Sequence, residues 1–177
     1  MTNKSDSRMA DNLFRHGILI GIAGGLAEVG VVCSYTALTG RDAASVARGI
    51  ARAVGLSGMS AAEGLAVHMG LAAALGVALL AVLRTMPVGA GPARVVPFMV
   101  LSLAAVWAIN FFVVLPAMRL DFVYLLPYGV TLASKLSFGL TAAGMLAWIG
   151  STGPARHMTD RTSTTGSSAP IGVASAT

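Results

Sequence analysis

The chain is poor in cysteine and in charged residues. Cys33 is the only cysteine among 177 residues, which excludes an internal disulfide and a metal cluster built from cysteines. Charged residues make up 11% of the chain, well below the roughly 25% that is typical of soluble domains. Motifs of nucleotide-binding loops, zinc proteases and serine hydrolases are also absent. We therefore predict a protein without catalytic activity, in which Cys33 is a small buried thiol.

Apolar residues dominate instead. They make up 55% of the chain, and the mean hydropathy is +0.77. A helix needs roughly 20 mostly apolar residues to cross a bilayer, and four stretches meet this requirement: Phe14–Leu38, Ala61–Leu83, Val95–Met118 and Phe122–Ile149. The alternating pattern of membrane β-strands is missing. The sequence therefore predicts an all-α membrane protein, a bundle of four transmembrane helices that contacts the lipid bilayer.

Three regions follow from this pattern. Residues 1–13 form a polar leader, residues 14–150 form the membrane domain, and residues 151–177 form a Ser/Thr/Gly-rich tail that we expect to be disordered. The first apolar run is longer than that of a signal peptide and follows a leader with acidic residues, so we interpret it as a retained anchor. A short match between residues 70–74 and 139–143 is compatible with two parallel two-helix repeats.

A short amphipathic helix is predicted between the first two spans. Asp42 is a suitable N-cap, Gly55 is a suitable stop, and Val46, Ile50 and Val54 recur on one face. Such a helix lies in the membrane interface. It is either a lid over the bundle or a loop that packs because it is amphipathic.

Basic residues predict the orientation of the chain. Seven arginines and lysines lie in the leader, the middle loop and the tail, and four lie on the other side. This distribution places both termini in the cytoplasm. The net charge of +5 is explained by this topology and by anionic lipids, because no nucleic-acid-binding motif accompanies it. We therefore expect no nucleic-acid partner.

Each span carries a strongly polar residue in its interior: Glu28, His68, Asn110 and Lys135. A charge at the centre of a bilayer costs about 2.5 to 3.5 kcal/mol on insertion scales, so such residues usually have partners. Counting along antiparallel helices at about 1.5 Å per residue places all four in one layer. We predict that Glu28 pairs with Lys135, either as a structural contact or as a site for a proton or small ion.

The neighbours of these residues support a polar centre. Tyr128 and Thr131 precede Lys135 at spacings that place all three on one helical face. His68 and Asn110 are expected to join helices through a hydrogen bond, with a proton relay or a substrate contact as the alternative. Haem would need a second buried histidine, and His16 lies at the opposite end of its span. The ligands are too few for a metal, so we predict neither a metal nor a cofactor.

Small residues line one face of the first span. Gly17, Gly21 and Gly25 form a repeated G-x-x-x-G pattern, which lets another helix approach closely. This face favours a subunit or scaffold that packs in a homo-oligomer or in a larger membrane complex. The alternative is a proton- or ion-coupled transporter or permeation unit that uses Glu28, His68 and Lys135.

Several short motifs carry a resemblance. They are A-G-G in the first span, His68 followed by Gly70 and Gly76, W-A-I-N-F-F-V-V-L-P from Trp107 to Pro116, and F-G-L in the fourth span. In this order they resemble small uncharacterised bacterial inner-membrane proteins of the YagU-like type, over residues 14–149. Ser137 stands where a histidine would strengthen the match. The resemblance implies a four-helix protein of the bacterial inner membrane and assigns no chemistry to it.

Overall fold

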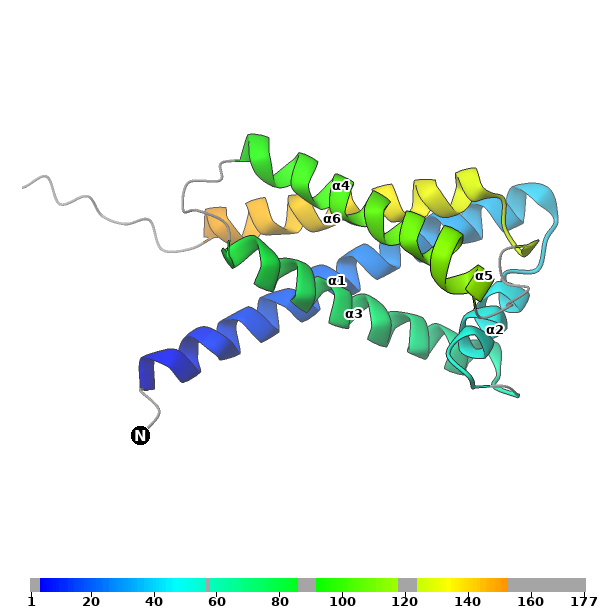
Figure 1. Cartoon of the computed structure of the whole chain (residues 1–177), viewed down its shortest axis with the longest axis horizontal. Helices are drawn as coiled ribbons and strands as arrows, with labels where there is room; N and C mark the ends of the chain where they lie inside the picture. Colours follow the sequence, from blue (N-terminus) through cyan, green and yellow to red (C-terminus); the bar gives the residue numbers. More distant parts are fainter. Residues whose placement is uncertain (1–3, 57, 86–91, 118–123, 153–177) are drawn as a thin grey trace, which may run out of the picture.

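A computed structural model of the chain describes residues 4–56, 58–85, 92–117 and 124–152, all within or between helices (Figure 1). Within these ranges no strand is present. The elements are α1 (Lys4–Thr39), α2 (Ala43–Ala53), α3 (Ala61–Thr85), α4 (Pro92–Ile109), η1 (Asn110–Val114), α5 (Leu115–Ala117) and α6 (Tyr128–Thr152). The leader is thus largely the first part of α1, whereas the tail from residue 153 onward lies outside the described residues.

Four helical stretches are long and apolar enough to cross a membrane: Ala10–Thr39, Ala61–Thr85, Arg94–Ala117 and Tyr128–Ser151. The predicted class is confirmed, and the protein is an all-α, multi-pass membrane protein. Helix α6 begins at Tyr128, and the described residues 124–127 before it are not α-helical, because residues before a proline disfavour the helical conformation and Pro127 directly precedes α6. Phe122, the predicted start of the fourth span, lies outside the described residues. The carbonyl of Pro127 accepts the first backbone bonds of the helix, from Val130 and Thr131.

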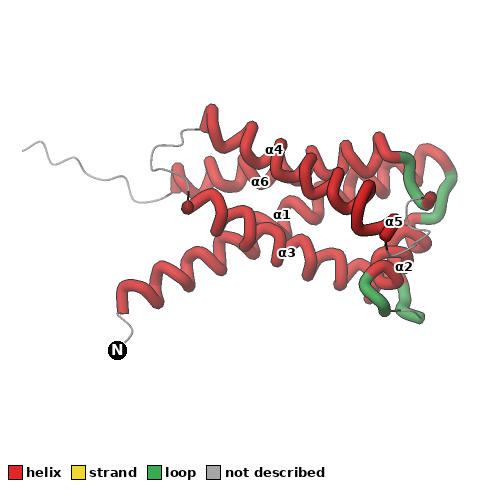
Figure 2. The backbone as a smooth tube through the Cα atoms, viewed as in Figure 1, coloured by secondary structure: helices red, strands yellow, loops and turns green. Residues whose placement is uncertain are grey.

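The four long helices form an open row in the order α3, α1, α6, α4. Helix α1 packs extensively against both α3 and α6, and α4 packs against α6. Consecutive spans run in opposite directions, so the start of α1 and the end of α6 lie at the same end of the bundle (Figures 1 and 2). Helix α2 lies at the other end. The two outer helices of the row, α3 and α4, make no extensive contact with each other.

Three glycines of α1, Gly17, Gly21 and Gly25, face α3. A Cβ atom on Gly17 would lie 2.6 Å from the Cα atom of Val77, and one on Gly21 would meet the backbone of Ala72 and Ala73. Gly76 of α3 completes the contact, since a Cβ there would meet the backbone of Gly17 and Gly21. The predicted close-packing face is therefore used within the chain, which removes it as a contact for another subunit.

An adjacent face of α1 packs on α6. A Cβ on Gly24 would lie 2.7 Å from the ring of Phe138, so the ring sits directly on the α1 backbone. Phe138, Ile20, Met99 and Leu103 are the largest side chains that are fully buried. They belong to α6, α1 and α4, and this cluster joins the three helices.

Helix α2 crosses the end of the bundle and is capped as predicted. The carboxylate of Asp42 accepts hydrogen bonds from the backbone N–H groups of Ala44 and Ser45 at 2.9 and 3.1 Å. Gly55 follows the helix with a φ of 83°, which favours glycine. Arg41 donates from Nη1 to the carbonyl of Leu125 at 3.1 Å, which ties this connection to the turn before α6.

Removal of the Asp42 carboxylate is expected to loosen α2. Asp42→Ala leaves two amides without an acceptor, so the amide protons of α2 should exchange faster, as measured by mass spectrometry in detergent. Asp42→Asn keeps one of the two acceptor oxygens and should exchange at a rate between those of Asp42→Ala and the wild type. The hydroxyl of Ser45 and the amide of Ala44 hold the pKa of Asp42 below its ordinary value of 3.8. The cap should therefore be intact at neutral pH and fail only as the pH falls through that lowered value. Equal exchange in all three proteins would contradict this role.

The third span widens near its end. Residues Asn110–Val114 form a π-helical turn, in which the N–H of Leu115 bonds to the carbonyl of Asn110. Pro116 follows, and a proline has no N–H to donate and clashes with the carbonyl four residues earlier. A π turn relieves this conflict by shifting the bonding pattern, and such turns are frequent at functional sites.

Candidate intramembrane site

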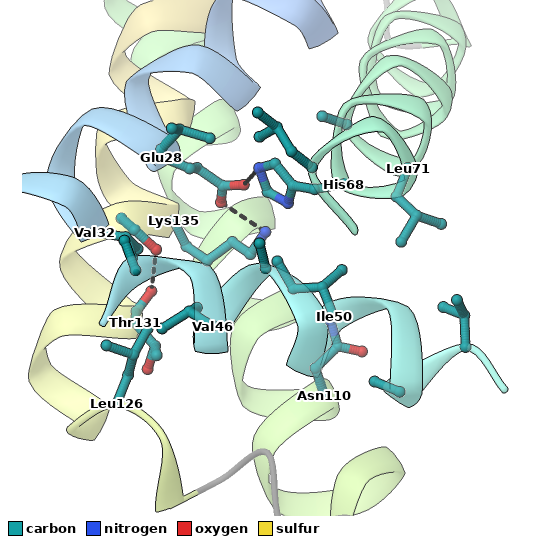
Figure 3. Close-up of a pocket in the computed structure, with 18 of the residues that line it drawn as sticks. Glu28, Val32, Val46, Ile50, His68, Leu71, Asn110, Leu126, Thr131 and Lys135 are labelled. Carbon is teal, nitrogen blue, oxygen red and sulfur yellow. Dashed lines mark hydrogen bonds and ion pairs between the residues drawn. The ribbon is translucent and has the colours of Figure 1, made fainter. Parts of the chain in front are cut away.

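Three spans bring charged or titratable side chains to one point (Figure 3). Lys135 of α6 places its Nζ 2.6 Å from Oε1 of Glu28 of α1. His68 of α3 places its Nε2 3.5 Å from the other carboxylate oxygen, Oε2. The carboxylate of Glu28 therefore lies between an ammonium group and an imidazole, and it connects three helices that cross the membrane.

Burial makes this arrangement energetically important. Glu28 is 3% exposed, and an isolated carboxylate at such a position would be strongly destabilised. Lys135 neutralises this charge at hydrogen-bond distance, so each group stabilises the ionised form of the other. With neutral His68 the three side chains carry no net charge, and with protonated His68 they carry one positive charge.

Part of the hydrogen-bonding capacity of this group is left unused. Nε2 of His68 and Oε1 of Glu28 are buried, and neither has a hydrogen bond of good geometry to the described protein atoms. The ammonium of Lys135 has three N–H donors, and Glu28 is its one partner in the described part of the chain. His68 faces Glu28, and no hydrogen bond joins it to Asn110, so the expected link between these two residues is not made.

A cavity of about 680 Å³ opens beside the three side chains. Its wall includes residues from α1, α2, α3, α6 and the segment from α4 to α5. Val46, Ile50 and Val54, the apolar face predicted for α2, all line it. The amphipathic helix thus turns its apolar side toward the cavity, and α2 covers the end of the cavity (Figure 3).

The remaining predicted site residues divide into two groups. Asn110 and Thr131 line the cavity together with Glu28, His68 and Lys135. Tyr128 is not among the lining residues; its ring is half exposed and packs edge-on against Trp107, with the ring centroids 6.3 Å apart.

Sequence reasoning did not identify the contacts of Trp107 or the role of Ser134. Nε1 of Trp107 donates to the hydroxyl of Thr131 at 2.9 Å, which joins α4 to α6 inside the membrane. Ser134 is buried and also lines the cavity. One feature of the sequence could have indicated the Trp107 contact: Trp107 is the only tryptophan near the middle of a span. Cys33 is exposed, contrary to expectation, and lines the open cavity.

Metal ligands are sparse in this region. Among the residues that the structure describes, no group of three His, Cys, Asp or Glu side chains lies close enough to hold a metal ion. The side chains around the cavity instead provide one carboxylate, one ammonium, one imidazole and neutral polar groups. These groups bind and exchange protons or pair with a charged solute.

Comparison with known proteins gave no relative: no family model, no curated protein and no solved structure matches the chain. The resemblance to the YagU-like proteins stays a prediction.

Proposed function

We propose that this protein is a proton-coupled transporter or permeation unit of the bacterial inner membrane, with both termini in the cytoplasm. One observation carries the proposal. The buried Glu28 carboxylate is shared by Lys135 at 2.6 Å and His68 at 3.5 Å, and all three line a cavity of about 680 Å³. The cavity makes the pair accessible to a solute, which a contact that only joins helices does not require.

The chemistry of coupling follows from competition for Glu28. The carboxylate binds either the ammonium of Lys135 or a proton. When a proton binds, the pair is broken and the Lys135 charge becomes free for a solute in the cavity. His68 lies close enough to the carboxylate to pass a proton to it after a small movement of the two side chains. Two charge states of one site therefore differ in their affinity for the solute, as coupled transport requires.

The test is flux into liposomes that contain the purified protein and a pH-sensitive dye. An imposed pH gradient, with sodium or potassium salts in separate runs, should dissipate faster than in protein-free liposomes. Glu28→Gln should slow this flux about tenfold or more, because glutamine cannot bind and release the proton. Glu63→Gln is the matched control. Glu63 accepts a 2.7 Å bond from the backbone of Ser60 at the start of α3 and does not line the cavity.

Two results would overturn the transport proposal. Wild-type liposomes that conduct no faster than empty ones would remove the activity itself. Flux that is unchanged in Glu28→Gln would separate the activity from this site.

A subunit role is the second candidate, and the open row of helices favours it. The outer helices α3 and α4 do not pack extensively on each other, and a partner helix from a second copy or from another membrane protein would fill the space between them. The exposed side chains there include Leu65, Leu71 and Ile109. Native mass spectrometry after extraction in a mild detergent should then detect an oligomer or a bound subunit. A lone monomer at all concentrations would contradict this role.

A further inference from the structure

The carboxylate of Glu28 is the least accessible part of the polar site. The side chain of Glu28 is 4% exposed, whereas those of His68 and Lys135 are 16% and 21% exposed. A molecule in the cavity therefore reaches the ammonium of Lys135 more readily than the carboxylate. The ammonium has three N–H donors and one protein partner, Glu28, in the described part of the chain, and unmet donors in a low-dielectric interior are costly. The site thus selects a hydrogen-bond acceptor, and a negatively charged one most strongly.

The rest of the cavity is apolar. Beyond the polar group its wall includes Val29, Val32, Ile50, Leu71 and Leu75. A volume of about 680 Å³ is within the range of roughly 300 to 1,000 Å³ that holds a drug-sized organic molecule. Such a wall would give a small inorganic anion nothing to contact. An occupant that matches both parts has a charged head and an apolar body.

Access to the cavity is from the side. Leu65 and Leu71 of α3 and Val114 of η1 line the cavity and are also exposed at the surface of the chain, by 41%, 51% and 38%. They lie where α3 and α4 face each other without extensive packing. In a bilayer this surface contacts acyl chains, so the apolar part of the cavity is continuous with the lipid phase.

We propose that the cavity binds a single-chain amphiphile with a carboxylate head, a fatty-acid-like molecule that is drawn from the bilayer between α3 and α4. The head accepts hydrogen bonds from the ammonium of Lys135, and the chain lies along the apolar wall. This inference rests on the proposed transport function and names the class of solute.

Charge balance couples binding to a proton. A second carboxylate beside Glu28 is repelled unless one of the two carboxyl groups is protonated or His68 gains a proton. The titratable side chains that line the cavity, among the described residues, are Glu28, Cys33, His68 and Lys135. Binding of the anion should therefore take up one proton, with Glu28 as the acceptor nearest to Lys135.

Binding is tested with the full chain in lipid nanodiscs and a fluorescent fatty-acid analogue as the probe. Oleate should displace the probe in a saturable way. Oleyl alcohol, which has the same chain and no charge, should bind about tenfold more weakly or worse. A lysophosphatidic acid with the same chain distinguishes a free fatty acid from a phospholipid head. Oleate binding in a weakly buffered solution should also raise the external pH.

Three variants address the site. Lys135→Met should weaken oleate about tenfold or more, and Lys135→Arg should restore part of the loss. Because Lys135→Met removes the partner of the buried Glu28 and lowers stability, Leu71→Trp provides an independent variant. It fills the exposed mouth without changing a charged residue and should block binding while the melting temperature stays unchanged. Glu63→Gln should bind like the wild type.

The outcomes separate this inference from the transport proposal. Equal affinity for oleate and oleyl alcohol, tighter binding of the lysophospholipid, or a dimer whose formation excludes the probe would overturn the fatty-acid assignment. Flux without oleate binding would overturn the assignment of the solute alone. Oleate binding without any flux would leave the site in place and remove the transport function.

Discussion

Replacement of Glu28 by glutamine is expected to lower the free energy of unfolding by about 3 kcal/mol, since loss of one member of a buried ion pair leaves the other charge without compensation. Lys135 lies 2.6 Å from the carboxylate, and Glu28 is its one partner in the described part of the chain. Unfolding by denaturant in detergent micelles, followed by circular dichroism, measures the change.

A double-mutant cycle isolates the pair. Glu28→Gln with Lys135→Met removes both charges and should recover part of the loss, because no buried charge remains. Lys135→Met alone should cost less than Glu28→Gln alone, since His68 at 3.5 Å can protonate and partly replace the ammonium. Strictly additive losses would mean that Glu28 and Lys135 do not interact in the folded protein. Glu63→Gln, which changes a carboxylate outside the cavity, should have little effect.

Substitution of Gly21 by alanine is the second large effect that we expect. The new Cβ would meet the backbone carbonyl of Ala72 and the Cα of Ala73, and a backbone cannot rotate out of the way as a side chain can. Helices α1 and α3 must then separate, at a cost of about 1 to 3 kcal/mol. Gly76→Ala should be similarly costly, since its Cβ would meet the backbone of Gly17 and Gly21.

Gly30 provides a control in the same helix. A Cβ at Gly30 would have no neighbour within 4 Å. Gly30→Ala should therefore leave stability unchanged or raise it by up to about 1 kcal/mol, because alanine favours the helix. In thermal unfolding, the melting temperatures of Gly21→Ala and Gly76→Ala should fall, whereas that of Gly30→Ala should stay the same or rise. Equal shifts for Gly21→Ala and Gly30→Ala would contradict close packing of α1 on α3.

Separation of α1 from α3 has a second readout. Glu28 lies seven residues after Gly21, on the same face of α1, and His68 approaches it from α3. Gly21→Ala should therefore weaken the contact between these residues and slow the proposed proton flux, although neither charged residue is changed. Stability loss without any change in flux would place the site outside the influence of this packing.

The helices and their common polar layer were predictable from local patterns. Length and apolar composition define a spanning helix. Because the rise per residue is constant, the number of residues between a side chain and the end of its span gives its depth in the membrane. This arithmetic grouped Glu28, Lys135 and His68 before any packing was known. The fourth span was predicted to start at Phe122, whereas α6 starts at Tyr128. Apolar composition alone does not show where a helix begins, and here the helix begins directly after Pro127.

The neighbours of each helix were not predictable in the same way. The face of Gly17, Gly21 and Gly25 suits any helix, and the sequence does not distinguish α3 of the same chain from a helix of another subunit. The π turn at Asn110 depends on how the chain resolves the conflict at Pro116, for which several solutions exist. The cavity arises from the mutual placement of five segments, and no local pattern encodes it.

An open row of helices also has a mechanical consequence. Helix α3 is held by α1 and α2, helix α4 is held by α6, and α3 and α4 do not pack extensively on each other. Their facing sides are therefore open to acyl chains in a bilayer. Acyl chains exert a lateral pressure that varies with bilayer thickness and lipid shape. This pressure acts directly on the space between the two helices, because no extensive interface between α3 and α4 resists it. The width of the cavity is therefore set jointly by the protein and by the membrane in which it lies.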